Sequence, residues 1–297
     1  MRALTLKHLR YFEALATHGH FGRAAETCGI SQPALSLQIK ELEGIMGGPL
    51  VERASREIRL TAMGEDLLAQ GSDILQQVND LSGLVRRQAG PFSGRLRLGV
   101  IPTIAPYLLP RIIQALADSY PDLKLEPKET ITQSLVSEIL ASRLDAAIVA
   151  LPVTEPALQE FTLFDEEFLL VRPTHDAALP VPTAAVLPTM ELLLLEEGHC
   201  FRDQALSFCD AAAVRPRQIM EGSSLSTLVQ MVSAGIGVTL IPEMARHFET
   251  RSADVAVSHF ATNPPRRTIG MIWRKTNPLS LELEEMGKII RKTAKNG

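Results

Sequence analysis

Residues 21–36 read FGRAAETCGISQPALS and predict two helices joined by a tight turn. The first helix runs from about Phe21 to Cys28 and ends at Gly29, because glycine readily adopts the left-handed conformation that closes a helix. Ser31 can cap the second helix with its hydroxyl, and Pro33 is tolerated in a first helical turn. The stretch therefore predicts a helix-turn-helix.

The residues on both sides of this stretch complete a small domain. An amphipathic helix is predicted before it, at about 5–17. Two short strands are predicted after it, at about 50–53 and 57–60. The inward face of the second turn helix carries Leu35, Ile39 and Leu42. Residues 4–60 thus predict a helix-turn-helix that is followed by a β wing.

The outer face of the second turn helix suits the major groove of DNA. Its polar residues recur every four positions, opposite the apolar ones. A glutamine can hydrogen-bond base edges, whereas wing arginines can bind phosphates and so position the domain. The residues expected to contact DNA are Gln32, Pro33, Ser36, Lys40, Arg53 and Arg56. The alternative for Lys40 and the two arginines is ordinary solvated charge.

Residues 61–89 predict one long helix that leads out of this domain. Every seventh position carries a large aliphatic residue, namely Leu60, Leu67, Ile74 and Leu81. Such an apolar row is typical of a helix that pairs with a second chain. Gly64 and Gly71 weaken the helix prediction, since glycine is a poor helix former. A short linker, GPFSG, follows at residues 90–94.

Strands and helices alternate from Arg95 onward. Strands are predicted at about 95–101, 123–129, 146–150, 168–172, 192–196, 218–221, 237–241 and 268–274, and helices at about 105–120, 133–142, 201–213, 225–234 and 279–293. This alternation predicts parallel sheets flanked by helices. About 200 residues of this kind fit two lobes.

Composition and charge narrow the class of protein. The chain has 297 residues, 45% apolar and 22% charged, which is typical of a soluble globular protein of two or three domains. The net charge is −4, divided into +2 over residues 1–60 and −6 over the rest, which favours a DNA-facing N-terminal part. No apolar run approaches the ~18 residues that span a bilayer. We see no signal peptide, so we expect a cytoplasmic protein without a membrane partner and not a transport solute-binding protein.

Two of the three cysteines lie close together in GHCFRDQALSFC, residues 198–209. They are nine positions apart on a predicted helix, which corresponds to a rise of about 13–14 Å. A disulfide needs a Cα separation of about 4.4–6.8 Å. A bond between Cys200 and Cys209 therefore requires the helix to break, which is the property of a redox switch. The alternative is a pair of small buried apolar residues in a reducing cytosol, which is how we interpret Cys28.

Several motifs in the chain resemble one family of bacterial regulators. The segments FGRAA, SQPALS and LTAMG, at residues 21–25, 31–36 and 60–64, resemble the DNA-binding domain of LysR-type transcriptional regulators. The chain from about residue 94 is similar to that family's effector domain. Within the family, GHCFRDQ with Cys209, PRRTIG and VIPT, at 198–204, 265–270 and 100–103, resemble the OxyR branch of hydrogen-peroxide sensors.

The resemblance implies a fold and a domain plan. The expected fold is mixed: an N-terminal, mainly α winged helix-turn-helix, a long linker helix and a C-terminal α/β effector domain, two-lobed and similar to periplasmic binding proteins. The expected domains are 1–62 for DNA binding, 63–92 for dimerisation and linkage, and 93–297 for redox sensing, the last with lobe I at about 93–164 and 268–297 and lobe II at about 165–267.

The resemblance also implies roles for the cysteines and their neighbours. Cys200 would react with peroxide and Cys209 would resolve the product to a disulfide. The residues expected to surround the peroxide or activate the thiolate are Thr103, Thr132, His199, Asp203 and Arg267, with Thr130 as an alternative to Thr132. Cys200 directly precedes the predicted helix, whose N–H groups favour an anion, and His199 and Arg202 add donors or positive charge. The alternative to a functional role is that His199 is an ordinary polar surface residue and that Arg266 and Arg267 form a solvated strand end.

The resemblance further implies partners. We expect a homotetramer, a dimer of dimers, that binds promoter DNA, contacts RNA polymerase and is reduced by a thiol reductant such as glutaredoxin or thioredoxin. We expect neither a cofactor nor a metal, since no CxxC or HxxxH grouping occurs. We do not expect an enzyme, although a thiol peroxidase would share the chemistry of Cys200. A second alternative is a LysR-type regulator that binds a small organic ligand between its lobes.

Overall fold

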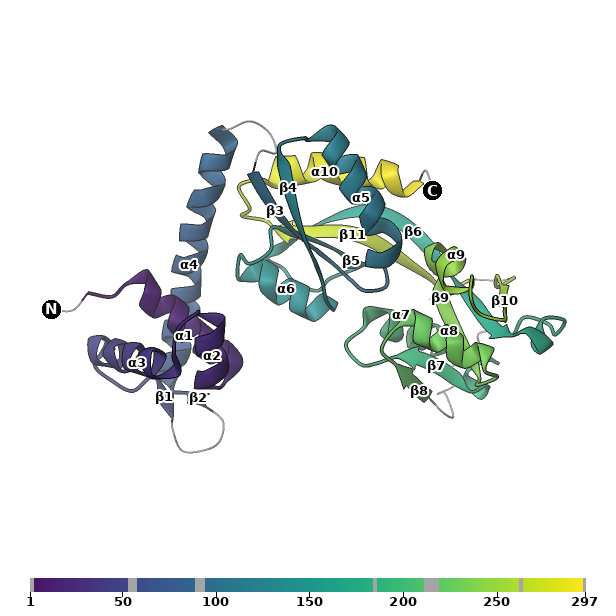
Figure 1. Cartoon of the computed structure of the whole chain (residues 1–297), viewed down its shortest axis with the longest axis horizontal. Coiled ribbons are helices and arrows are strands. Elements are labelled where there is room, and N and C mark those ends of the chain that lie inside the picture. Colours follow the sequence, from purple (N-terminus) through teal and green to yellow (C-terminus); the bar gives the residue numbers. More distant parts are fainter. Residues whose placement is uncertain are drawn as a thin grey trace. The chain divides into compact units, whose positions relative to one another are not determined.

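The computed structural model describes residues 3–52, 58–88, 94–183, 186–210, 219–261 and 264–295. The chain divides into two compact units, Met1–Val85 and Arg86–Gly297 (Figure 1). In the described ranges, no helix combines the length and the apolar character needed to cross a membrane.

The N-terminal unit is built from short helices and one β ribbon. Its elements are α1 (Leu6–His18), α2 (Phe21–Thr27), α3 (Gln32–Met46), β1 (Val51–Glu52), β2 (Arg59–Leu60) and α4 (Ala62–Gln88). The strands β1 and β2 pair antiparallel. The predicted winged helix-turn-helix and the long helix that follows it are therefore confirmed.

The turn between α2 and α3 forms for the expected reasons. Gly29 has a φ of 66°, a left-handed conformation that suits glycine. The Ser31 hydroxyl accepts a hydrogen bond from the backbone N–H of Ala34, and Pro33 lies in the first turn of α3. On the other side of α3, Leu35, Ile39 and Leu42 are fully buried in the core of the unit.

Close packing explains two of the glycines in α4. A Cβ on Gly64 would lie 2.2 Å from the carbonyl oxygen of Leu50, and one on Gly71 would lie 3.2 Å from Leu9 Cδ2. Leu67 belongs to the core of the unit, whereas Ile74 is 41% exposed. The prediction of one continuous row facing a second chain is therefore wrong at Leu67, which is buried inside its own unit.

The C-terminal unit is an α/β structure. Its elements are β3 (Gly94–Val100), α5 (Ala105–Ser119), β4 (Leu123–Glu129), α6 (Thr132–Leu140), β5 (Ala146–Leu151), β6 (Leu158–Pro173), β7 (Leu192–Leu195), α7 (Cys200–Asp210), β8 (Ile219–Gly222), α8 (Leu225–Ser233), β9 (Val238–Pro242), α9 (Arg246–Glu249), β10 (Val255–Ser258), β11 (Arg266–Arg274) and α10 (Ser280–Lys295). Among the described residues, the strands form one sheet in the order β4-β3-β5-β11-β6-β9-β7-β8, with β10 also paired to β6.

This sheet is mixed, so the expectation of parallel sheets is correct at its two ends and wrong at its centre. The strands β3, β4 and β5 are parallel at one end, and β7, β8 and β9 are parallel at the other. Between these groups, β11 is antiparallel to both β5 and β6, and β6 is antiparallel to β9. The strand β6 is also much longer than predicted, because only its last third is a continuous buried run.

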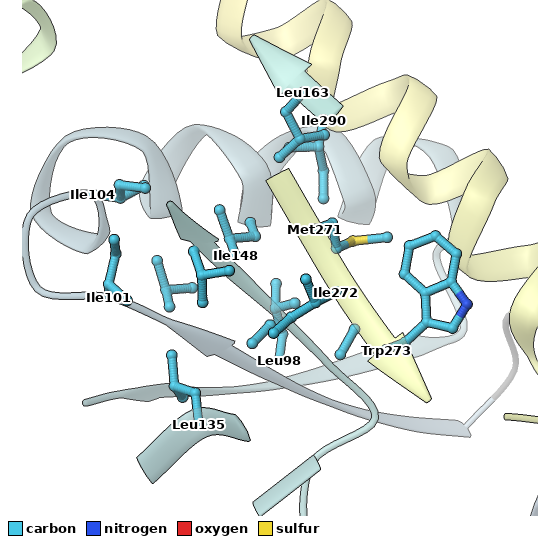
Figure 2. Packing of buried hydrophobic residues seen from close by; sticks show 14 of the residues in the cluster. Leu98, Ile101, Ile104, Leu135, Ile148, Leu163, Met271, Ile272, Trp273 and Ile290 are labelled. Atoms are coloured by element: carbon cyan, nitrogen blue, oxygen red, sulfur yellow. The ribbon is translucent and has the colours of Figure 1, made fainter. Parts of the chain in front are cut away.

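Two hydrophobic cores define two lobes in this unit. The lobe I core surrounds β3, β5, β11 and α5 and includes Leu98, Ile148 and Trp273 (Figure 2). The lobe II core surrounds β7, β9 and α8 and includes Phe168 and Leu193. The strand β6 contributes side chains to both cores and therefore joins the lobes, in agreement with the predicted two-lobed effector fold.

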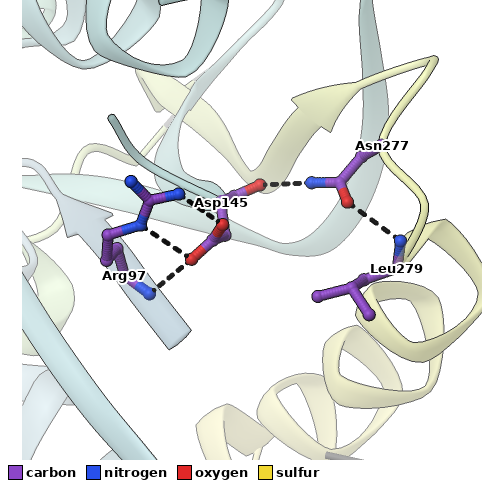
Figure 3. Close-up of polar contacts among 4 residues, drawn as sticks. All are labelled: Arg97, Asp145, Asn277 and Leu279. Atoms are coloured by element: carbon purple, nitrogen blue, oxygen red, sulfur yellow. Dashed lines mark hydrogen bonds and ion pairs between the residues drawn. The ribbon is translucent and has the colours of Figure 1, made fainter. Parts of the chain in front are cut away.

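A polar cluster fixes one edge of lobe I (Figure 3). The Asp145 carboxylate accepts three hydrogen bonds from Arg97, one from its backbone N–H and two from its guanidinium. Asn277 donates to the carbonyl of Asp145 at 3.0 Å and accepts from the backbone N–H of Leu279 at 2.9 Å. The cluster thus ties the start of β5 to β3 and to the turn before α10.

Candidate functional site

The outer face of α3 carries the residues expected to read DNA. Gln32, Pro33 and Lys40 are exposed, and Ser36 is half-buried. All four lie on the surface that the buried leucines and isoleucine of α3 leave open. Arg53 and Arg56 lie outside the described residues.

The cysteine segment forms the predicted helix. The helix α7 begins at Cys200, includes Cys209 and is described to Asp210, in the second lobe (Figure 1). Cys200 is a half-buried free thiol in the first turn, where backbone N–H groups have no helical partner. Within this intact helix the two cysteines are separated by a rise of about 13–14 Å, so a disulfide is excluded while the helix persists.

A cavity of about 840 Å³ lies beside the first turn of α7. Its lining includes four of the residues that the sequence singles out: Thr132, Cys200, Asp203 and Arg267. Thr103 lies behind Arg267 and His199 precedes Cys200, and neither is among the lining residues. Thr132 lines the cavity and Thr130 does not, which favours Thr132 of the two threonines.

Cys200 reaches across from lobe II to lobe I. Although α7 belongs to lobe II, Cys200 packs against the lobe I core. The turn before it contains Gly198 with a φ of 93°, and a Cβ there would lie 3.1 Å from Ile131 of lobe I. The next residue, Thr132, has a buried hydroxyl that finds no hydrogen-bond partner within the described ranges. This hydroxyl is therefore available to a small polar molecule in the cavity.

Arg267 is the buried cation of the site. Its side chain is 0% exposed and forms an ion pair with Glu166, which is 4% exposed. It donates to the hydroxyl of Thr103 at 2.8 Å and to the Thr103 carbonyl at 3.1 Å. The guanidinium also lies 5.5 Å from the ring centre of Phe201, the residue after Cys200. Arg267 is thus a buried residue that links Glu166 and Thr103, and it is not a solvated strand end.

Two residues next to Cys200 differ from the sequence expectation. Burial lowers the pKa of His199, and nearby Glu196 opposes this shift more weakly. His199 therefore favours the neutral imidazole, which can donate or accept a hydrogen bond but adds no charge. Arg202 bonds to the carbonyl of Leu195 at 3.0 Å and to Glu221 at 2.6 Å, so its charge is directed to lobe II. The feature that favours an anion at Cys200 is therefore the N-terminus of α7, because the charge of Arg267 is paired with Glu166.

Sequence reasoning missed two residues of the site. Glu166 is the buried partner of Arg267, and Gln204 lines the cavity with a buried Oε1 that has no hydrogen-bond partner in the described part of the chain. The charged run Asp165-Glu166-Glu167 gives no sign of which carboxylate points inward. Only the register of β6 against β11, which pairs Glu166 with Arg267, determines it.

Known protein families and solved structures agree with this architecture. Residues 6–65 match the bacterial regulatory helix-turn-helix family of LysR proteins, and residues 89–295 match the LysR substrate binding domain. The chain therefore belongs to the LysR family of bacterial regulators. Within that family it falls in the OxyR branch, as its relatives and structural neighbours are OxyR proteins and hydrogen peroxide-inducible activators.

Three of these similar proteins cover nearly the whole chain. The DNA-binding transcriptional dual regulator OxyR of Escherichia coli K12 is 40% identical over 291 residues, 97% of this chain and 95% of its own. A full-length OxyR variant from Pseudomonas aeruginosa superimposes with a TM-score of 0.73 at 36% identity, over 98% of this chain and 96% of its own. A Corynebacterium glutamicum OxyR mutant with H2O2 bound has a TM-score of 0.68 at 32% identity, over 99% and 94%.

Proposed function

We propose that this chain is a DNA-binding transcriptional regulator that senses hydrogen peroxide through a reversible Cys200–Cys209 disulfide and controls peroxide-defence genes. The observation that carries the proposal is the first turn of α7. It holds the Cys200 thiol at a cavity lined by Thr132, Asp203 and Arg267, on the same helix as Cys209. The names of the similar OxyR proteins support the same function.

The oxidation of Cys200 and Cys209 proceeds in two steps. The Cys200 thiolate attacks one peroxide oxygen, so that a sulfur–oxygen bond forms and the oxygen–oxygen bond breaks. The other oxygen leaves as hydroxide and becomes water on taking a proton, while the sulfur is oxidised by two electrons to a sulfenic acid. The Cys209 thiol then attacks that sulfur and a second water leaves. A dithiol reductant returns both cysteines to thiols by exchange.

The disulfide changes the structure because α7 cannot contain it. The helix must then open between Cys200 and Cys209, and its first turn contacts both lobes through Cys200 and Arg202. We propose that this change is transmitted between subunits of a homotetramer to the DNA-binding domains. In this proposal residues 1–62 bind promoter DNA, 63–92 dimerise and link, and 93–297 sense peroxide in the cytoplasm, with RNA polymerase and a glutaredoxin- or thioredoxin-type reductant as partners.

In the DNA-binding domain, α3 is the proposed reading helix. Gln32, Pro33, Ser36 and Lys40 are presented on its open face, and Arg53 and Arg56 of the wing are the proposed phosphate contacts. Base contacts would specify the site and phosphate contacts would position the domain on it.

Peroxide treatment of the full-length protein tests the proposal. Mass spectrometry should find a Cys200–Cys209 disulfide, and the footprint on the protein's own upstream DNA should change. Cys200→Ser should abolish both, whereas Cys209→Ser should leave an oxidisable Cys200 without the disulfide. An unchanged footprint response in Cys200→Ser would contradict the proposal.

The size of the cavity supports a second candidate function. At about 840 Å³ it lies within the range of about 300–1,000 Å³ that binds small organic ligands. A regulator of this kind would bind its ligand between the lobes without needing either thiol. Thermal stabilisation of the Cys200→Ser, Cys209→Ser double variant by a small organic ligand would favour this second function. If no ligand stabilises the double variant, peroxide sensing remains the supported function.

A further inference from the structure

Glu166 is a buried acidic side chain that pairs with Arg267, one of the residues that line the cavity of Cys200. It lies on β6, directly opposite Arg267 of β11 in the antiparallel register. Only 4% of its side chain is exposed, and Arg267 is 0% exposed. A buried carboxylate is costly unless it is paired and hydrogen-bonded, so its contacts must be well defined.

Each oxygen of the Glu166 carboxylate has its own partner. Oε2 accepts from Arg267 Nε at 2.9 Å and lies 2.8 Å from Nη2. Oε1 accepts from the backbone N–H of Met244 at 2.8 Å. The carboxylate is therefore fixed by lobe II backbone on one side while it holds one edge of the guanidinium on the other. Because the guanidinium is planar, a two-point contact on one edge sets its plane.

The rest of the guanidinium is fixed by its neighbours. Nη2 also donates to the Thr103 carbonyl, and Nη1 donates to the Thr103 hydroxyl. Within the described ranges, the second hydrogen on Nη1 has no such partner. Arg267 is one of the residues that line the cavity together with Cys200, which leaves this N–H as the remaining donor of its guanidinium. Since Thr103 accepts from Arg267, its own hydroxyl hydrogen is also directed away from the guanidinium.

We propose that Glu166 is a positioning residue for the reaction of Cys200 with peroxide. This inference rests on the proposed function. When the thiolate attacks, the sulfur–oxygen bond forms, the oxygen–oxygen bond breaks and negative charge develops on the departing hydroxide. A donor fixed beforehand stabilises such charge best, and Arg267 is that donor only in the plane that Glu166 sets. Glu166 acts through Arg267 and does not touch the peroxide.

Glu166→Asp is the sharpest test, because it keeps the charge and shortens the side chain by one methylene. The shorter carboxylate cannot reach both Arg267 and Met244. In the full-length protein, we expect the rate of Cys200 oxidation by H2O2 to fall about tenfold or more, because small displacements of a reacting group are costly. The rate of Cys200 alkylation by iodoacetamide, which needs the thiolate but no donor to a departing hydroxide, should stay unchanged. Quenched samples analysed by mass spectrometry give both rates.

Glu166→Gln tests the charge separately. It leaves Arg267 with an uncompensated positive charge, which favours an anion at Cys200. We therefore expect alkylation of Cys200 at a fixed pH to be faster in this variant and to keep the wild-type rate in Glu166→Asp. If Glu166→Gln does not fold, Glu166→Asp alone decides the test.

Glu167→Gln is the matched control. Glu167 is the next residue on β6, is 34% exposed and pairs with Arg266 at 2.5 Å. Both of its rates should match those of the wild type. If Glu166→Asp oxidises at the wild-type rate, or if oxidation and alkylation slow equally, the inference is overturned. If wild-type Cys200 fails to react with H2O2, the proposed function itself fails, and the inference with it.

Discussion

The contact of Arg202 with lobe II predicts a measurable effect on the disulfide. Arg202 lies in the first turn of α7 and bonds to the carbonyl of Leu195 on β7 and to Glu221 on β8. These bonds hold the first turn against the sheet and so stabilise the helical, reduced form. Replacing Arg202 with methionine keeps an apolar stem but removes the donors. The reduced form should lose stability relative to the disulfide form, in which α7 is broken.

The expected magnitude follows from the exposure of the partners. Arg202 is 11% exposed, but Glu221 is 45% exposed and its ion pair is screened by solvent. Hydrogen bonds to charged groups contribute about 1.5–3 kcal/mol and exposed ion pairs less than about 1 kcal/mol, so we take about 1.5 kcal/mol for the set. For a two-electron couple, about 1.4 kcal/mol corresponds to ~30 mV. The midpoint potential of Arg202→Met should therefore be about 30 mV more negative.

The assay is equilibration in thiol–disulfide buffers of graded potential, followed by alkylation and mass spectrometry of the cysteine peptides. Arg246→Met is the control, because it removes an exposed arginine of lobe II that lies 3.8 Å from Glu243. The control should keep the wild-type potential. An unchanged or less negative potential in Arg202→Met would refute the reasoning that the α7 contacts oppose the disulfide.

Three further predictions concern pH, packing and DNA. Because burial lowers the pKa of His199, the unfolded chain binds more protons than the folded chain near that pKa. The stability from this group is therefore present above the unfolded pKa of about 6.5 and is lost as the pH falls below it. His199→Asn should flatten that part of the pH profile of stability in urea titrations, and an equally steep profile would contradict this. Gly64→Ala should lower the melting temperature, although alanine usually stabilises a helix, because its Cβ would meet the Leu50 carbonyl at 2.2 Å; a raised melting temperature would show that α4 can shift. Gln32→Ala should cost about 1–3 kcal/mol of operator binding and relax the preference at one base pair in a selection experiment, whereas a uniform loss across sequences would indicate a phosphate contact instead.

The parts that the sequence predicts best are those determined by local chemistry. The turn at Gly29, the cap at Ser31 and the buried row of α3 depend on a few neighbouring residues, and each forms as expected. The helix at Cys200 is likewise local, and its incompatibility with a disulfide follows from helix geometry alone.

The parts that depend on long-range pairing could be predicted only in outline. The first two thirds of β6 lack a continuous apolar run, because that part of the strand has one covered and one open side. Its antiparallel register with β11 could not be read from the chain, and that register selects Glu166 as the partner of Arg267. The ion-pair partner of Arg202 likewise depends on tertiary structure, because Glu221 lies on the separate strand β8.

Hydrogen–deuterium exchange of the peptide covering Cys200 to Asp210 tests the central claim most directly. The reduced protein should show slow exchange along α7, and the peroxide-oxidised protein, with its Cys200–Cys209 disulfide verified by mass in the same sample, should show fast exchange over this peptide. Equal protection of the peptide with the disulfide formed would contradict the claim that the bond and the helix exclude each other.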